Sequence, residues 1–148
     1  RRLFKDMLNT PPYRLPNAGD EGSRLVDAVP GSFFMLKPGL LTPQDIEGLF
    51  DSRIFLYYEE KVLGRKFQEM GLKTVLVTDE SYVHAHSATI DKSLKRMVDK
   101  QRLLHQSKLY YYREYLHAGP ALMAAAGVAL DIILAEVWFL TVVCRMRW

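Results

Sequence analysis

The stretch Gly48-Leu49-Phe50-Asp51-Ser52-Arg53-Ile54-Phe55-Leu56-Tyr57-Tyr58-Glu59-Glu60 ends a mostly apolar, aromatic run in two adjacent carboxylates. After it, apolar residues recur at helical spacing as far as Met70, and Gly71 is a typical helix stop. The sequence therefore predicts a helix from Glu59 to Met70 with both acids in its first turn. The helix dipole favours carboxylates there, so capping alone explains them, but a catalytic base could occupy the same place.

Four shorter elements are predicted on either side of this helix. Thr42-Pro43-Gln44-Asp45 is a helix opening, with a capping threonine and proline at the first helical position, and that helix should end near Gly48. The apolar runs Phe33 to Leu36 and Lys73 to Val77 predict strands, and Ser81 to His86 a further extended piece. We therefore expect an α+β fold in which a small sheet is covered by the helix that begins at Glu59.

The C-terminal third of the chain predicts two long helices. Asp91 to Leu116 is charged and amphipathic, whereas Pro120 to Cys144 is apolar and long enough to span a bilayer. Asp131 lies near the centre of the second segment and Glu136 follows it, and each central acid costs up to about 3.5 kcal/mol on insertion scales. A docked helix, an oligomer contact or a shallow membrane-surface element is therefore favoured over a true span.

Composition restricts the class of protein. The chain has 148 residues, of which 49% are hydrophobic, so it can bury a core of its own. Its net charge of +3 is mild and its basic residues are interspersed with acids, so nucleic acid is not an implied partner. The single cysteine, Cys144, excludes an internal disulfide, and this cysteine usage favours the cytoplasm.

Three blocks in order, Gly31 to Lys37, Gly48 to Glu60 and Tyr82 to Ser87, make the region from Val26 to Leu116 resemble a known family. It is similar to the C-terminal half of inverting family-2 glycosyltransferases, particularly bacterial enzymes of polysaccharide synthesis. The resemblance implies a partial GT-A-like half-domain. It divides the chain into a loop-rich arm at 1–25, a glycosyltransferase-like part at 26–117 and an apolar C-terminal helix at 118–148.

The resemblance also implies roles for individual residues. Glu60 corresponds to the family's catalytic base, and Glu59 to a position that orients this base or binds acceptor. Tyr58 belongs to the same motif and is taken as a substrate contact. Gly31 and Ser32 would let backbone and a small hydroxyl approach the sugars, although a bulge in a strand explains them equally well.

Metal and nucleotide binding are implied for the full-length family only. His84 or His86 corresponds to a family histidine that approaches a divalent Mn or Mg ion and the diphosphate, and a structural or surface role is the alternative. The family's N-terminal half carries an Asp-x-Asp motif, and no Asp-x-Asp occurs in this sequence. Lys61 stands where many relatives have a further acid, and its charge would lower the basicity of a neighbouring carboxylate.

The leading interpretation is therefore a fragment resembling a glycosyltransferase. Such an enzyme transfers a sugar from a nucleotide-sugar to a cell-surface polysaccharide or lipid-linked acceptor, and the isolated chain should be inactive and need no cofactor. The alternative is a non-catalytic interaction module that self-associates. On either interpretation we expect a homodimer through Ala121 to Val143, in the cytoplasm or at the inner face of the membrane.

Overall fold

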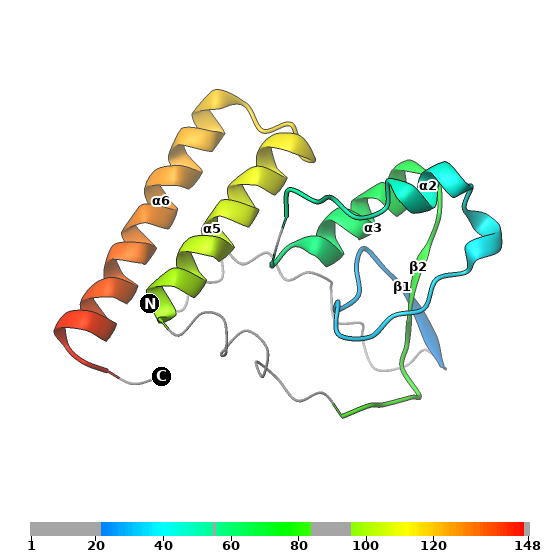
Figure 1. Cartoon of the computed structure of the whole chain (residues 1–148), viewed down its shortest axis with the longest axis horizontal. Coiled ribbons are helices and arrows are strands. Elements are labelled where there is room, and N and C mark those ends of the chain that lie inside the picture. Colours follow the sequence, from blue (N-terminus) through cyan, green and yellow to red (C-terminus); the bar gives the residue numbers. More distant parts are fainter. Residues whose placement is uncertain (1–21, 55, 84–95, 147–148) are drawn as a thin grey trace. The chain divides into compact units, whose positions relative to one another are not determined.

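The computed structural model describes residues 22–54, 56–83 and 96–146, which form two compact units. Unit 1 comprises residues 1–51 and 60–83, and unit 2 comprises residues 52–59 and 84–148. The predicted α+β class with a long C-terminal helix is confirmed (Figure 1). The elements in chain order are β1 (Ser23–Val26), η1 (Pro38–Leu40), α2 (Pro43–Glu47), α3 (Glu59–Glu69), β2 (Thr74–Val77), α5 (Met97–Glu114), α6 (Pro120–Trp138) and η2 (Phe139–Val143).

The sheet of unit 1 has two antiparallel strands. β1 pairs with β2 in the register Ser23↔Val77 and Val26↔Thr74, so the predicted strand at 73–77 is confirmed. Its partner was not predicted, because residues 23–25 were assigned to the loop-rich N-terminal arm. Most of that arm lies outside the described residues.

The prediction of a strand from Phe33 to Leu36 is wrong. These residues adopt no regular structure, and Phe33 and Met35 are 58% and 84% exposed. An apolar run shows that side chains can be buried, but a strand also needs a neighbouring backbone to receive its hydrogen bonds. In the part of the chain that the structure describes, the sheet consists of β1 and β2 alone.

Helix α2 forms as predicted because its signals are local. The Asp45 amide donates to the Thr42 hydroxyl at 3.2 Å, and the Thr42 amide donates to the Asp45 carboxylate at 2.8 Å. This reciprocal capping box satisfies two donors that the helix itself leaves unpaired. Gly48 follows as the C-cap. The hydrogen bonds from Thr42 also lower the pKa of Asp45.

Helix α3 confirms the predicted helix from Glu59, and Gly71 ends the following turn with a φ of 71°. Its apolar face is buried, with Val62 and Leu63 only 2% and 5% exposed. Gly64 lies on this face against the backbone that follows β1, because a Cβ built on it would be 2.1 Å from the Asp27 carbonyl oxygen. Only glycine permits so close an approach.

Polar contacts also tie α3 to the rest of unit 1. The Gln68 amide nitrogen donates to the Asp27 carboxylate at 3.1 Å. The Lys66 ammonium donates to the carbonyl oxygens of Gly48 and Leu49 at 2.6 and 3.2 Å. Leu49 is only 1% exposed, so Lys66 binds the backbone at a buried residue. Helix α3 is therefore joined to the segments that follow both β1 and α2.

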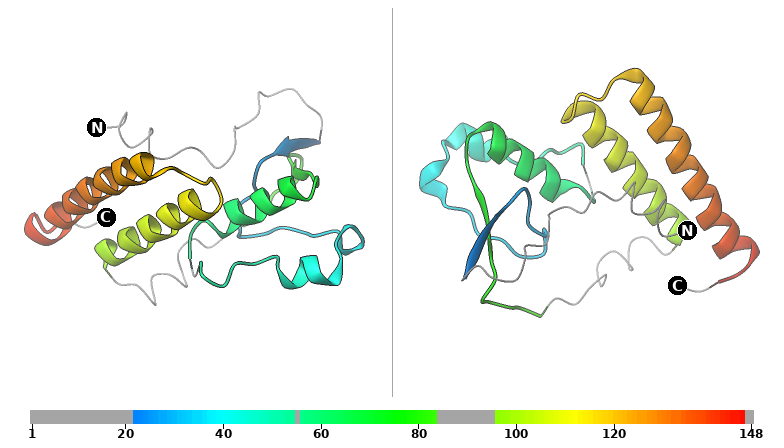
Figure 2. Two further views of the ribbon diagram at one scale, coloured as in Figure 1. Left: turned by 90° about the horizontal axis from the view of Figure 1, so that it is seen from above. Right: turned by 180° about the vertical axis from the view of Figure 1, so that it is seen from behind.

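In unit 2, α5 and α6 lie side by side and antiparallel, as Figures 1 and 2 show. α5 accounts for the described part of the predicted helix at 91–116, and residues 91–95 lie outside it. α6 continues without a break into the π-helical turn η2, which confirms the predicted C-terminal helix. Ala126 and Leu130 of α6 are buried, as are His105, Ser107 and Lys108 of α5.

His105 makes the stability of unit 2 depend on pH. Its Nε2 lies 2.7 Å from the Gln101 amide nitrogen, while Nδ1 is buried with no hydrogen-bond partner among the described residues. Burial, with a smaller contribution from Lys108, lowers the pKa of His105 below 6.5, although Asp131 opposes the shift. The folded state therefore binds this proton less readily than the unfolded state does.

We predict that stability falls on acidification through this group. The contribution is fully present above the unfolded pKa of 6.5 and is lost as the pH falls below that value, where the unfolded chain gains the proton. Urea unfolding followed by circular dichroism at a series of pH values measures the effect. His105→Leu should flatten the dependence and the exposed His117→Asn should not. An equal slope in wild type and His105→Leu would contradict the prediction.

Candidate functional site

The structure brings together two segments that the sequence separates by 29 residues, because Gly31 lies beside the carboxylate of Glu60. A Cβ built on Gly31 would be 3.9 Å from Glu60 Oε2, which is an ordinary van der Waals distance. Glu60 is in the first turn of α3 and is half-buried. The helix N-terminus supplies positive potential at this point, which stabilises an ionised carboxylate.

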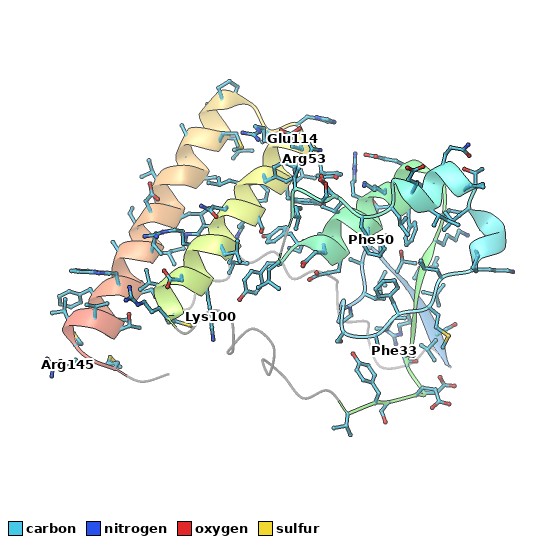
Figure 3. The ribbon with its side chains drawn as sticks, viewed as in Figure 1. Phe33, Phe50, Arg53, Lys100, Glu114 and Arg145 are labelled. Carbon is cyan, nitrogen blue, oxygen red and sulfur yellow. The ribbon has the colours of Figure 1, made fainter. Side chains whose placement is uncertain are left out.

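Ser32 and Tyr82 extend this cluster. The Ser32 and Tyr82 hydroxyls are hydrogen-bonded, and the Phe33 and Tyr82 rings lie 5.5 Å apart at an interplanar angle of 46°. Phe33, labelled in Figure 3, and Tyr82 are both more than half exposed. Two hydroxyls and two exposed aromatic rings therefore adjoin the glycine that faces Glu60. Polar groups next to aromatic surface suit a sugar, whose rings carry both hydroxyls and apolar C–H faces.

Lys61 is the cation next to Glu60 in sequence. Burial lowers the pKa of Lys61, and the negative charge of Glu60 partly opposes the shift. The charge of Glu60 therefore acts on Lys61, and the expected effect of Lys61 on the basicity of Glu60 stays a prediction.

The backbone just before α3 is strained. Tyr57 and Tyr58 both have left-handed conformations, with φ angles of 65° and 71°. This conformation costs a residue with a side chain about 1 to 2 kcal/mol, and here two occur in succession. Strained backbone of this kind concentrates at functional sites, where the surrounding structure holds it in place. The turn leads directly into Glu59 and Glu60.

Contacts within unit 2 hold this turn. The Ser107 hydroxyl donates to the Leu56 carbonyl oxygen at 2.7 Å, and the Tyr58 and Tyr111 rings lie 5.4 Å apart. Arg53 adds a cation–π contact, with its guanidinium 5.1 Å from the centre of the Tyr110 ring. Figure 3 shows Arg53 beside the C-terminal part of α5, near Glu114.

The sequence analysis did not find this contact surface, although a signal was present. Ser107, Tyr110 and Tyr111 occur at positions i, i+3 and i+4 of one helix, so they share a face. The face binds the turn that precedes α3. We name these three residues the α5 clamp.

Two of the predicted substrate residues lie in unit 2. Tyr58 is only 7% exposed and packs on Tyr111, so its ring is part of the core of that unit. Glu59, the first residue of α3, is half-buried and falls in unit 2, whereas Glu60 falls in unit 1. Substrate contact by Tyr58 and Glu59 stays a prediction.

The predicted metal ligands His84 and His86 lie outside the described residues. Within residues 22–54, 56–83 and 96–146, no group of three or more His, Cys, Asp or Glu side chains is arranged to hold a metal ion. The described part of the chain therefore does not fit a divalent cation, and we derive no chemistry through one.

Comparison with known proteins found no match to a family model, a curated protein or a solved structure. A functional conclusion for this chain therefore rests on its own residues.

The α5 clamp gives a testable prediction. Ser107→Ala should lower the free energy of unfolding by about 1 to 3 kcal/mol, because it leaves the Leu56 carbonyl without this donor in a strained turn. Urea unfolding measures the loss, and hydrogen exchange at the amides of residues 62–65, the first that the helix itself bonds, reports whether the start of α3 loosens. Ser52→Ala, at an exposed position of the same segment, is the matched control. Unchanged stability and exchange in Ser107→Ala would show that the clamp does not hold the turn.

Proposed function

We propose that this chain is the acceptor-side part of an inverting glycosyltransferase of the GT-A type. Glu60 is the base, and the acceptor sugar binds next to Gly31, Ser32 and Tyr82. The donor is a nucleotide-sugar, and the acceptor is a cell-surface polysaccharide or lipid-linked glycan, as the family resemblance implies. The reaction takes place in the cytoplasm or at the inner face of the membrane.

The observation that carries the proposal is the 3.9 Å approach between the Gly31 Cβ position and Glu60 Oε2. The resemblance assigns both residues to one site, and nothing in their sequence separation requires them to meet. The exposed Phe33 and Tyr82 rings supply a surface on which a sugar can stack.

The proposed chemistry needs one carboxylate. The Glu60 carboxylate accepts the proton of an acceptor hydroxyl while the hydroxyl oxygen attacks the anomeric carbon of the donor. The new glycosidic bond forms as the bond to the nucleoside diphosphate breaks on the opposite face, and the anomeric configuration inverts. Gly31 leaves room for the hydroxyl beside Glu60, and Ser32 and Tyr82 hold neighbouring hydroxyls.

Donor binding is not accounted for by the described residues. They contain no metal site, and the sequence has no Asp-x-Asp motif. Holding both substrates in line accounts for a large share of the catalysis of such a reaction, so transfer requires a nucleotide-sugar-binding half. We therefore expect the 148-residue chain to bind nucleotide-sugars weakly and to transfer little sugar by itself.

The test is a transfer assay on the full product of the gene, with a panel of radiolabelled nucleotide-sugars and membrane or polysaccharide acceptors. Label in a glycan product is the expected result. A full-length protein that binds no nucleotide-sugar and labels no acceptor would overturn the proposal. The contribution of Glu60 is then measured by its substitution with glutamine.

The alternative function is a non-catalytic interaction module that self-associates. The observation that favours it is the exposed apolar surface of α6, on which Val128 and Ile132 are 62% and 58% exposed. Light scattering tests the self-association, and nucleotide-sugar binding by the full product of the gene distinguishes the two functions. A stable dimer with no affinity for nucleotide-sugars favours the module, and a monomer of 17.1 kDa at high concentration contradicts the predicted homodimer.

A further inference from the structure

The surface of α6 that faces away from α5 is apolar and uncovered in unit 2. The helix that runs from Pro120 to Val143 has 24 residues, and only 11% of its most apolar stretch is buried. The core helix of a soluble protein would be mostly buried instead. Large apolar side chains account for the exposed surface, namely Leu122, Val128, Ile132, Trp138, Phe139 and Val142.

Three of the exposed apolar residues form a stripe along one side of the helix. At about 100° per residue, Val128, Ile132 and Phe139 lie within about 40° of one another. Asp131 and Glu136 then lie on opposite sides of this stripe, about 80° and 60° from its centre. Ala126 and Leu130, which are buried, lie on the other side of the helix. The acids that argue against a membrane span therefore flank this three-residue face, and the exposed Leu122 and Trp138 lie beyond them, each about 100° from its centre. We call this face the α6 stripe.

Charge is distributed unevenly between the two units. Unit 2 contains ten Lys and Arg residues against six Asp and Glu, a net charge of +4. Unit 1 contains ten against eleven, a net charge of −1. The unit that carries the α6 stripe is thus the basic one. Basic residues are attracted to anionic lipid headgroups, and the attraction adds to the burial of an apolar face.

The end of the helix has the composition of a membrane interface. Trp138 is half exposed, and Arg145 follows the last helical turn, as Figure 3 shows. Tryptophan and arginine concentrate where acyl chains meet headgroups, because each has an apolar part and a polar end.

We propose that the α6 stripe lies in the surface of an anionic lipid bilayer, with the axis of α6 parallel to the membrane plane. Val128, Ile132 and Phe139 face the acyl chains, and Asp131 and Glu136 reach the headgroup water at either side. This inference does not depend on the proposed sugar transfer. Combined with that function, it would keep the enzyme at the membrane where a lipid-linked acceptor is presented.

An in-plane position fits better than a span. The helix is about 36 Å long, which would suffice to cross a bilayer. However, α5 packs along α6 and carries charged residues that include Lys100, Arg102 and Arg113. If α6 spanned the bilayer with α5 packed against it, the charged residues of α5 would be placed in the hydrocarbon. The in-plane position keeps α5 on the aqueous side.

The bilayer also fits the stripe better than a second copy of the chain does. Asp131 lies in the middle of the 24-residue helix. A centred two-fold pairing of two stripes sets the Asp131 side chains of both copies at the same level, where like charges oppose each other. At a membrane each acid meets water instead.

The test measures binding of the whole chain to phosphatidylcholine vesicles with and without phosphatidylglycerol. Trp148→Phe leaves Trp138 as the single tryptophan, and its emission should shift to the blue on binding. Ile132→Glu should weaken binding about tenfold or more, because it places a carboxylate in the middle of the stripe. Val83→Glu adds the same charge at an exposed apolar position in unit 1 and should bind nearly as well as wild type.

Three outcomes would overturn the proposal. Vesicle binding that is equal in Ile132→Glu and Val83→Glu would show that the stripe does not contact lipid. A dimer that Ile132→Glu dissociates, with no vesicle binding by wild type, would make a second copy the occupant. The third outcome concerns the depth of the helix. A single tryptophan is introduced by Ile132→Trp, with Trp138 and Trp148 replaced by phenylalanine, and its fluorescence should be quenched by lipids brominated near the headgroup. Quenching by lipids brominated at the chain ends would indicate a span instead. Circular dichroism confirms that each variant keeps its helices.

Discussion

Glu60→Gln is expected to reduce glycosyl transfer by the full product of the gene about 10²- to 10⁴-fold. Glutamine keeps the size of the side chain and its place in the first turn of α3, but it cannot accept the proton of the acceptor hydroxyl. Because the proton moves during the attack, the loss should appear in kcat, with little change in KM for the nucleotide-sugar. Initial rates with a fixed acceptor and varied donor measure both.

The control for this substitution is a second carboxylate of the same helix. Glu69 lies at the far end of α3 and forms an exposed pair with Arg65 at 2.8 Å. Glu69→Gln removes the same charge and should keep nearly full activity, since exposed pairs of this kind contribute little. Full activity in Glu60→Gln would remove Glu60 from the mechanism. A large loss of activity in both variants would point to the charge of α3 and not to a base.

Gly64→Ala is expected to lower the stability of unit 1 by about 3 kcal/mol, at the upper end of the range for overpacked positions. The added Cβ would be 2.1 Å from the Asp27 carbonyl oxygen and 3.2 Å from the Ala28 Cβ. The first neighbour is backbone, so either α3 or the segment after β1 has to move, and overpacking of this kind typically costs about 1 to 3 kcal/mol. Hydrogen exchange of the α3 amides measures the loss within unit 1.

Gly127→Ala is the matched control, because it also adds a methyl group to a glycine inside a helix. Beyond the backbone of its own helix and its chain neighbours, no heavy atom of the described residues lies within 4 Å of the Cβ position at Gly127. Alanine favours the helix over glycine by about 1 kcal/mol, so this variant should stabilise α6. Equal effects in the two variants would show that helix propensity, and not the contact with Asp27, decides the outcome at Gly64.

The candidate site was only partly predictable. Glu60 was found because its motif is continuous in the sequence, and Gly31 and Ser32 because a second continuous block contains them. The approach of Gly31 to Glu60, the hydrogen bond between Ser32 and Tyr82 and the clamp on the Tyr57–Tyr58 turn required the fold. Each joins residues far apart in the chain, and no periodicity in a single segment reports such a pair.

The sequence by itself determined the elements that depend on neighbouring residues. Thr42 and Asp45 cap α2, helical spacing and the stop at Gly71 define α3, and the apolar run from Pro120 defines α6. These signals act over one to several turns, through caps and helical periodicity, so they can be read locally.

Only the tertiary structure decided what those elements meet. It paired β2 with Ser23–Val26 and left Phe33 to Leu36 without a strand partner. It also put Gly64 against Asp27 and, within unit 2, left one side of α6 uncovered. The physical reason is that strand pairing and burial depend on which distant segment packs against a given surface. That choice also depends on the free energy of closing the intervening loop, which neither segment determines by itself.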